Sequence, residues 1–266
     1  MISVGKGLLT LVTCLLFWQC NAVVQNDGDE VKDEQARNLD IYLLIGQSNM
    51  AGRATIEGAD KDTLKNVFLY TGTVGCEWEK AANPLNKYST IRKDISMQRL
   101  GPGYHFAKTM VELNGKNSIG LVVNAKGGTK IELWQPGGEF YNEAVKRTKA
   151  ALKYGTLKGI LWHQGESNSS KYNEYMPKII VLIEALRSDL AVKNLPFVAG
   201  QLSGDKENRA GFNQMILDLP NKLQGCGVVS SEGTGTIDST HFDAASQQLL
   251  GQRYAQKMFE IQAKQN

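Results

Sequence analysis

The stretch IYLLIGQSNMAG, residues 41–52, indicates the fold, because an apolar run is followed at once by a polar turn. Apolar residues that do not alternate with polar ones are typical of a strand buried on both faces of a parallel sheet. Gly46 and the small pair Ala51 and Gly52 allow a sharp bend from this strand into a helix. The stretch therefore predicts a strand–turn–helix unit in which Ser48 is either a helix N-cap or a nucleophile.

Further apolar runs of the same character occur at 119–125, 159–164, 197–201 and 226–230. Stretches with helical periodicity lie between and after them, at 103–114, 139–153, 172–189, 208–218 and 243–264. Strands that alternate with helices predict a three-layer α/β/α sandwich around a mostly parallel sheet of about five strands, similar to the flavodoxin fold. Residues 53–100 show weak periodicity, so we expect an irregular segment with one short strand at 66–70.

The N-terminus has the pattern of a secretory signal peptide. A weakly positive start is followed by an apolar run at 7–18 and then by small residues at the positions that signal peptidase reads. The run is shorter than the roughly 20 residues of a transmembrane helix, although a lipoprotein acylated at Cys20 remains an alternative. We therefore expect a signal peptide at 1–22, a flexible leader at 23–38, a domain at 39–266 and a secreted or periplasmic protein.

Charge and cysteine content narrow the choice of partners. The chain has 266 residues and a formal net charge of +3, with no Lys/Arg block, so neither nucleic acid nor an anionic membrane is indicated. Cys76 and Cys226 of the domain either form a disulfide or are two buried thiols. The sequence has no CxxC, HExxH or histidine-rich spacing, so it predicts no metal site. It leaves the oligomeric state open.

Polar turn residues follow the predicted strands, at 47–49, 127–129, 164–168 and 238–243. In a parallel sheet, ligands bind at the carboxyl ends of the strands. Since each of these four segments follows a predicted strand, we expect them to converge on one edge of the sheet.

Three histidines could activate a serine at that edge. His105 is expected to pack in a helix or to lie on the surface, and His163 at a strand end is either structural or part of the site. His241 follows Asp238 by three residues, a separation at which one tight turn lets the carboxylate reach the ring. The alternative is that Asp238 or Thr240 caps the final helix.

Four blocks together carry a family resemblance: GQSNMAG at 46–52, GGTKIELW at 127–134, WHQGESN at 162–168 and DSTHFD at 238–243. In order and spacing they resemble the SGNH-hydrolase superfamily, and more narrowly carbohydrate esterase family six and sialate O-acetylesterase-like (SASA) domains. The resemblance extends from about residue 40 to about residue 260.

This resemblance implies a role for each of several residues. Ser48 matches the nucleophile, His241 the general base and Asp238 its partner. The implied oxyanion donors are the Ser48 N–H, the Gly128 N–H in preference to that of Gly127, and the Gln164 amide. The residues expected to bind substrate or support the site are Gln47, Asn49, Gly127, Glu166 and Trp134. The alternative for Glu166, that it is a glycosidase acid, would need a second suitably placed carboxylate.

The function that the resemblance implies is a secreted serine esterase that removes O-acetyl groups from acetylated xylan or a similar glycan. A sialate O-acetylesterase is the first alternative, and a secreted glycan-binding protein without activity is an alternative of another class. No cofactor is implied, and the partner expected is an acetylated carbohydrate. Met50 and Trp134 lie next to the proposed nucleophile and oxyanion segments, where they either close a small pocket around the acetyl methyl group or pack in the core.

Overall fold

Seven strands form one sheet in the order β3-β2-β4-β1-β5-β6-β7. The structure is a computed structural model that describes residues 1, 38–115, 117–204 and 206–265. The strands are β1 (Leu39–Gly46), β2 (Val67–Thr73), β3 (Cys76–Lys80), β4 (Ile119–Ala125), β5 (Gly155–His163), β6 (Phe197–Gly200) and β7 (Cys226–Val229). Neighbouring strands are parallel except β2 and β3. The mostly parallel sheet is confirmed, but the prediction of about five strands is wrong.

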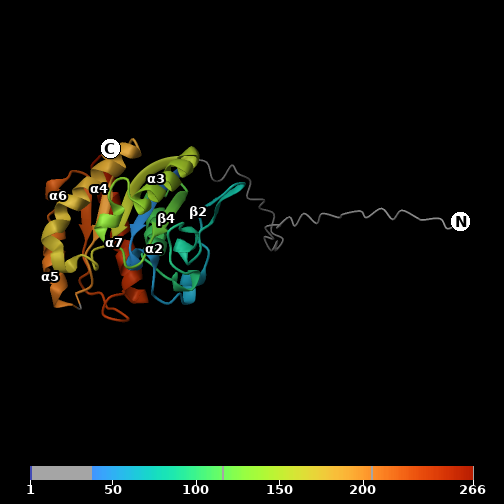
Figure 1. The fold of residues 1–266 in the computed structure, drawn as a ribbon. Helices are drawn as coiled ribbons and strands as arrows, with labels where there is room; N and C mark the ends of the chain where they lie inside the picture. The colour runs from blue at the N-terminus through green and yellow to red at the C-terminus, as the bar shows by residue number, and fades with distance from the viewer. Residues whose placement is uncertain (2–37, 116, 205, 266) are drawn as a thin grey trace. The chain divides into compact units, whose positions relative to one another are not determined.

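Helices cover both faces of this sheet (Figure 1). They are α1 (Ser48–Ala51), α2 (Gly103–Asn114), α3 (Glu139–Ala151), α4 (Tyr175–Asp189), α5 (Ala210–Ile216), α6 (Leu219–Lys222) and α7 (Ala244–Ala263). Short 3-10 turns lie at Gly58–Lys61, Leu85–Tyr88, Ile95–Met97, Ile131–Trp134, Leu152–Tyr154, Ser169–Glu174 and Glu207–Arg209. Since three of these turns and two strands fall in 53–100, that segment is less irregular than its weak periodicity predicts.

Central strand β1 shows how the layers form. Successive side chains of a strand point to opposite faces. Ile41 and Leu43 pack in one cluster with residues of α3, α4 and α5, whereas Tyr42 and Leu44 pack in a second cluster with residues of α2 and α7. Both faces of β1 are therefore buried, which is why its sequence is apolar without alternation. The predicted α/β/α sandwich is confirmed.

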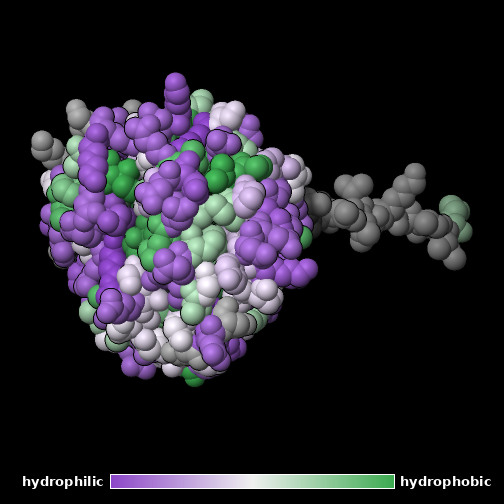
Figure 2. Space-filling view, turned by 90° about the vertical axis from the view of Figure 1, so that its left-hand side faces the viewer, coloured by the Kyte–Doolittle hydropathy of each residue, from purple (hydrophilic) through white to green (hydrophobic). Residues whose placement is uncertain are grey.

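The surface is mostly hydrophilic on the face that Figure 2 shows, with hydrophobic residues in small separate groups. The large apolar side chains of the domain are concentrated in the two core clusters instead.

Cys76 and Cys226 lie on the two outermost strands of the sheet, β3 and β7. Neighbouring strands are about 4.8 Å apart, so five intervening strands separate the two residues by far more than a disulfide can span. The disulfide alternative is therefore wrong for a pairing within one chain. Cys226 is buried, and this burial raises the pKa of its thiol to about 11.

The predicted signal peptide and leader lie, apart from Met1 and Asn38, outside the described residues, and both stay predictions. Among the residues that the structure describes, no helix is both long enough and apolar enough to span a bilayer.

Candidate active site

The polar segments predicted to converge do lie at one edge of the sheet. Gly46 at the end of β1 pairs with Ala125 of β4 and with His163 of β5, so the three strands end side by side. Gly46 has a φ of +136°, and a Cβ there would overlap the His163 carbonyl group. Glycine is therefore required for β1 to approach β5 and then turn into α1, which begins at Ser48.

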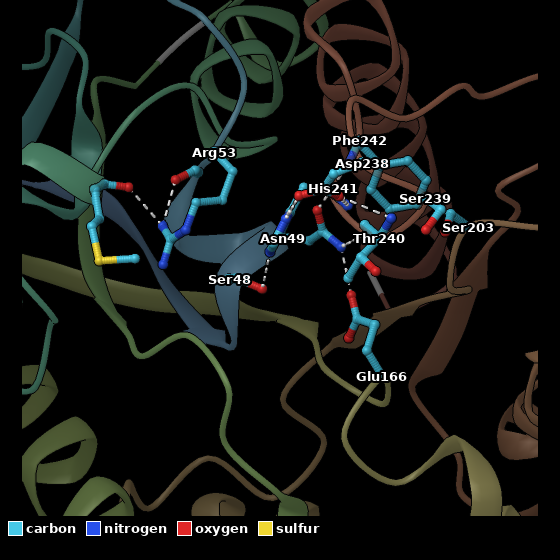
Figure 3. Close-up of polar contacts among 12 residues, drawn as sticks. Ser48, Asn49, Arg53, Glu166, Ser203, Asp238, Ser239, Thr240, His241 and Phe242 are labelled. Carbon is cyan, nitrogen blue, oxygen red and sulfur yellow. Dashed lines mark hydrogen bonds and ion pairs between the residues drawn. The ribbon is translucent and has the colours of Figure 1, made fainter. Parts of the chain in front are cut away.

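A chain of two hydrogen bonds joins the predicted nucleophile to the predicted acid (Figure 3). The Ser48 Oγ lies 3.0 Å from the His241 Nε2, and the His241 Nδ1 lies 2.6 Å from the Asp238 Oδ2. Ser48 is only 5% exposed but lines a pocket together with His241. This is the arrangement in which an imidazole can remove a proton from a serine.

Asp238 fixes both the histidine ring and the turn that carries it. Its Oδ1 accepts hydrogen bonds from the N–H groups of Thr240 at 3.0 Å and His241 at 2.7 Å. Although partial desolvation raises the pKa of Asp238, the hydrogen bonds from the His241 ring and from these N–H groups outweigh it and lower the pKa. The ionised carboxylate is an acceptor, so the Nδ1 of His241 must donate, which leaves its Nε2 to accept the Ser48 proton.

The alternative that Asp238 or Thr240 caps the final helix is wrong. Helix α7 begins after Asp243, whose side chain accepts a hydrogen bond from the Ser246 N–H at 2.8 Å. Asp238 lies several residues upstream, in the turn that closes on His241.

Asn49 ties this turn to the start of α1, which carries the serine (Figure 3). Its Oδ1 accepts from the Phe242 N–H at 3.1 Å, and its Nδ2 donates to the Thr240 carbonyl at 3.1 Å and to the Glu166 Oε1 at 2.5 Å. Because Asn49 is fully buried, it does not contact the pocket and supports the site from behind. Glu166 does line the pocket, and its other oxygen, Oε2, is buried with no partner among the described residues.

Both glycines of the second block line the pocket beside Ser48. A Cβ on Gly127 would lie 3.3 Å from the Ser48 Cβ, and Gly128 has a φ of +76°. Within the described residues, the N–H groups of Ser48, Gly127 and Gly128 donate to no protein acceptor. They are thus free to bind an oxyanion.

Gln164 does not reach the pocket, contrary to the sequence-based expectation. It is 1% exposed, and its Nε2 is directed at three oxygen atoms, on Gln47, Thr129 and Asn168, at 2.8–3.2 Å. Its Oε1 accepts from the Tyr175 hydroxyl at 2.7 Å. Gln47 lines the pocket instead, and because its Oε1 accepts from Gln164, its own NH₂ group is the end left for a ligand.

The aromatic and apolar residues expected around the acyl group are also elsewhere. Trp134 is fully buried in the core, and its indole N–H donates to the Thr129 hydroxyl at 3.0 Å. Met50 is 3% exposed and packs in the cluster shared with α2 and α7. Of the two alternatives, core packing is therefore confirmed for both residues, and the alternative that they close the acyl pocket is wrong.

The pocket holds about 360 Å³ and contains cationic side chains that sequence reasoning missed. Arg53, Lys93, Lys206 and Arg209 all line it, and Met97 is its one large apolar side chain among the described residues. These residues lie in segments without a recognisable motif, so only the fold brings them together.

The remaining histidines take part in other interactions. The His105 ring pairs with Asp60 at 2.7 Å, and His163 is buried with its Nδ1 3.0 Å from the Tyr254 hydroxyl. Burial lowers the pKa of His163, although the charge of Glu166 acts against this shift. In the part of the chain that the structure describes, no three His, Cys, Asp or Glu side chains cluster as metal ligands do.

A larger cleft of about 660 Å³ lies near the opposite ends of β1 and β5. Asp40, Lys158 and several Asn and Gln side chains line it. We place the active site in the smaller pocket because the serine–histidine pair opens into it.

The protein is therefore of the α/β class in which serine, histidine and aspartate side chains are hydrogen-bonded in series at the carboxyl edge of a parallel sheet, as in serine hydrolases. The family model described as carbohydrate esterase, sialic acid-specific acetylesterase (SASA) matches residues 38–260, so the chain belongs to this family. An Arabidopsis thaliana protein named "probable carbohydrate esterase" is 30% identical over 243 residues, which are 81% of this chain and 88% of the relative. The resemblance found in the sequence motifs is confirmed.

Solved structures show the same fold. The X-ray structure of an Arabidopsis thaliana protein has a TM-score of 0.74 at 28% identity and covers 83% of this chain and 97% of its own. A carbohydrate acetylesterase from Xanthomonas citri has a TM-score of 0.63 at 20% identity, over 85% of this chain and 57% of its own. Family membership identifies the protein as a carbohydrate esterase.

Proposed function

We propose that the protein removes O-acetyl groups from a carbohydrate through an acyl-enzyme formed on Ser48. The observation that carries this proposal is the hydrogen-bonded chain from Ser48 through His241 to Asp238, with distances of 3.0 and 2.6 Å. Membership of a carbohydrate esterase family supports an ester on a sugar as the substrate.

In the first half of the reaction, the His241 Nε2 takes the Ser48 proton as Oγ attacks the acetyl carbonyl carbon. The carbonyl electron pair moves to the oxygen and returns when the bond to the sugar oxygen breaks. That oxygen leaves with the proton from His241. A water molecule then repeats the sequence on the acetyl-Ser48 ester and releases acetate.

The oxyanion formed in each half needs donors that are already in place. We assign this role to the Ser48 N–H, an N–H of the Gly127–Gly128 pair and the Gln47 side-chain amide. Gln47 replaces Gln164 here because Gln47 lines the pocket, whereas Gln164 is buried behind it and holds the Gln47 Oε1 at 3.2 Å.

Acetylated xylan and O-acetylated sialic acid both fit this mechanism, and they differ in charge, because sialic acid carries a carboxylate. The alternative of a glycan-binding protein without activity is disfavoured by the intact hydrogen-bonded chain from Ser48 to Asp238.

We further propose that residues 1–22 direct export. If so, intact mass of secreted material will show a mature chain beginning near Val23, whereas a lipid-modified Cys20 would indicate an anchored protein.

The experiment that tests the function is acetate release from acetylated xylan and O-acetylated sialic acid, with wild type and Ser48→Ala. We expect Ser48→Ala to fold and to lose turnover by several powers of ten, as loss of a triad member does. Ser188→Ala, a change of the same kind on the exposed surface of α4, is the control and should keep wild-type turnover. Substantial activity in Ser48→Ala would show that this serine is not the nucleophile.

A further inference from the structure

The cleft of about 660 Å³ at the other edge of the sheet takes no part in the proposed reaction. Asp40 at the start of β1 and Lys158 in the first half of β5 line it, whereas Ser48 follows the far end of β1. Since a strand advances about 3.3 Å per residue, the cleft lies roughly 20 Å from the nucleophile. A ligand bound in the cleft is therefore outside the catalytic pocket.

Amide side chains are the most frequent polar groups in the lining of this cleft. They come from the end of α2, from the loops before β4, β6 and β7, and from the end of α7 and the residues after it, so the fold gathers them from distant parts of the sequence. The lining includes Asn114, Asn117, Asn194, Gln224, Gln262 and Gln265. Because an amide donates through its NH₂ group and accepts through its oxygen, the partner of one end decides what the other end offers a ligand.

Two of these amides are oriented by a buried carboxylate. The Asn114 Nδ2 donates to the Asp40 Oδ2 at 2.7 Å, and the Asn117 Nδ2 donates to the Asp40 Oδ1 at 3.3 Å. Asp40 is 4% exposed, and the Lys158 Nζ lies 3.8 Å from its Oδ1. A carboxylate surrounded by these donors acts as an acceptor, so both amides must turn their NH₂ groups toward it and their oxygens away from it.

Two further amides are oriented by backbone carbonyl groups. The Gln262 Nε2 donates to the Lys158 carbonyl at 3.0 Å, and the Gln265 Nε2 donates to the Asn194 carbonyl at 2.8 Å. A carbonyl group only accepts, so here too the amide oxygen is the end left over. Across the described residues, none of the four amide oxygens accepts a hydrogen bond from the protein, and none is buried without a partner. Four oriented acceptors are therefore open to a ligand.

The lining favours a neutral ligand over an ion. Lys158 and Lys264 repel a metal cation, and Asp40, the one carboxylate among the described lining residues, is already engaged by the two asparagines. An anion is disfavoured as well, because it would meet the four acceptor oxygens. The buried side chains of Leu157 and Leu195 add an apolar surface. A sugar ring matches this lining, because its hydroxyl groups donate hydrogen bonds and its C–H groups pack on apolar side chains.

We propose that this cleft is a second carbohydrate-binding site, which holds a neutral part of a glycan chain and does not cleave it. Each free amide oxygen accepts from a sugar hydroxyl, and because the amides are oriented before the ligand arrives, binding orders few side chains. The inference goes beyond the proposed function, since it does not require that Ser48 attacks an ester.

The test measures the binding of unacetylated xylohexaose, cellohexaose and mannohexaose to the protein by isothermal titration calorimetry. These probes carry no ester, so binding is observed without turnover. We expect at least one of them to bind with a dissociation constant of about 1 mM, the strength of a few neutral hydrogen bonds. Absence of binding by all three would overturn the inference.

The variants locate the bound sugar. Thr156→Trp fills the cleft from an exposed position at the start of β5 and should weaken binding about tenfold or more. Thr73→Trp is the matched control, because Thr73 is an exposed threonine of β2 that does not line the cleft, and it should bind as the wild type does. Gln265→Met removes one of the four oxygens and should weaken binding about fivefold, whereas Gln252→Met on the exposed surface of α7 should not.

The same variants separate this site from the catalytic pocket. Thr156→Trp should hydrolyse p-nitrophenyl acetate at the wild-type rate, and Ser48→Ala should bind the oligosaccharides as the wild type does. Oligosaccharide binding that survives Thr156→Trp, or that is lost in Ser48→Ala, would place the sugar in another site and would overturn the inference while the proposed function stands. Binding of Ca²⁺ alone by the wild type but not by Thr156→Trp would make the cleft a cation site and overturn it as well.

Discussion

Asp238 acts through both oxygens of one carboxylate, and each oxygen has a different task. Oδ2 holds the His241 Nδ1 at 2.6 Å and so fixes the ring, while Oδ1 accepts two backbone N–H groups and so fixes the turn. These bonds lower the pKa of Asp238 against the desolvation that raises it. The charge of Asp238 is therefore kept at acidities at which an ordinary aspartate begins to take up a proton.

The pH dependence of activity follows from this shift. Since the pKa of Asp238 is lowered, its ionised carboxylate stabilises the turn throughout the range above the ordinary aspartate pKa, near pH 4. This stabilisation is lost only as the pH falls through the lowered pKa. We therefore expect protonation of Asp238 to add no step to the pH profile of kcat/KM above the ordinary aspartate range, near pH 4. A step at or above that pH that is absent from the residual activity of Asp238→Asn would contradict this.

Asp238→Asn should retain the fold and lose about four powers of ten in kcat, because an amide can donate to His241 and select the wrong tautomer. Asp218→Asn is a suitable control, since Asp218 is a partly exposed aspartate that pairs with Lys222 and does not line the pocket. Measured kcat near that of wild type in Asp238→Asn would remove Asp238 from the catalytic machinery.

Gln47 provides the sharpest test of the oxyanion assignment. Gln47→Ala deletes the amide that lines the pocket, so we expect kcat to fall about 10²- to 10³-fold with little change in KM, as for other single donors. Gln47→Glu should be at least as slow, because a carboxylate repels the oxyanion. If both variants keep wild-type kcat, the donors are the backbone N–H groups alone.

Asn49 lies where α1 meets the 238–243 turn, and its hydrogen bonds hold Ser48 and His241 in their relative positions. Asn49 joins the start of α1 to the 238–243 turn through Thr240 and Phe242. Asn49→Ala removes these bonds and leaves a buried N–H without a partner, so we expect a loss of about 1–3 kcal/mol in stability. A shift of the turn by about 1 Å would lower kcat about a hundredfold as well. Thermal unfolding and kcat together check this; a stability loss with unchanged kcat would make Asn49 purely structural.

The close approach of β1 to β5 at Gly46 predicts that a larger residue at this position destabilises the domain. Gly46→Ala should destabilise the domain by about 2–4 kcal/mol, because its Cβ would overlap the His163 carbonyl. Gly58→Ala is the matched control: Gly58 also has a positive φ, of +51°, but no atom lies within 4 Å of its added Cβ. Denaturant melts should therefore show a much smaller loss, about 1 kcal/mol, for Gly58→Ala. Equal losses of stability in the two variants would mean that backbone strain, and not the overlap with the His163 carbonyl, causes the loss in Gly46→Ala.

Helices and strands could be predicted from the sequence where a segment has one clear hydrophobic pattern. The expected helix 103–114 matches α2, and the apolar runs at 119–125 and 226–230 match β4 and β7 closely. Strand β3 (Cys76–Lys80) was missed because it is an edge strand with polar residues on its surface, which gives no apolar run. Pairing with β2, and not its own sequence, makes it a strand.

The packing of the whole domain decides features of the active site that no single sequence motif contains. The motifs placed Ser48, Asp238 and His241 together because each follows a strand of one parallel sheet. They could not show that Gln164 is buried behind Gln47, or that Arg53 and Arg209 flank the serine, because those facts depend on how separate loops pack. Sequence adjacency could not decide the place of Met50 either: it is two residues from Ser48, yet it packs in the core.

The pocket as a whole predicts the acyl specificity. It holds about 360 Å³, its lining is mainly polar and charged, and Met97 is the one large apolar side chain among the described lining residues. Each buried CH₂ is worth about 0.8 kcal/mol only where an apolar surface receives it, so a longer acyl chain gains little here and must displace water from charged groups. We therefore expect kcat/KM to fall from p-nitrophenyl acetate to the butyrate and further to the octanoate. A rise towards octanoate would demand an apolar groove beside Ser48 and would make the protein a lipid esterase built on the same fold.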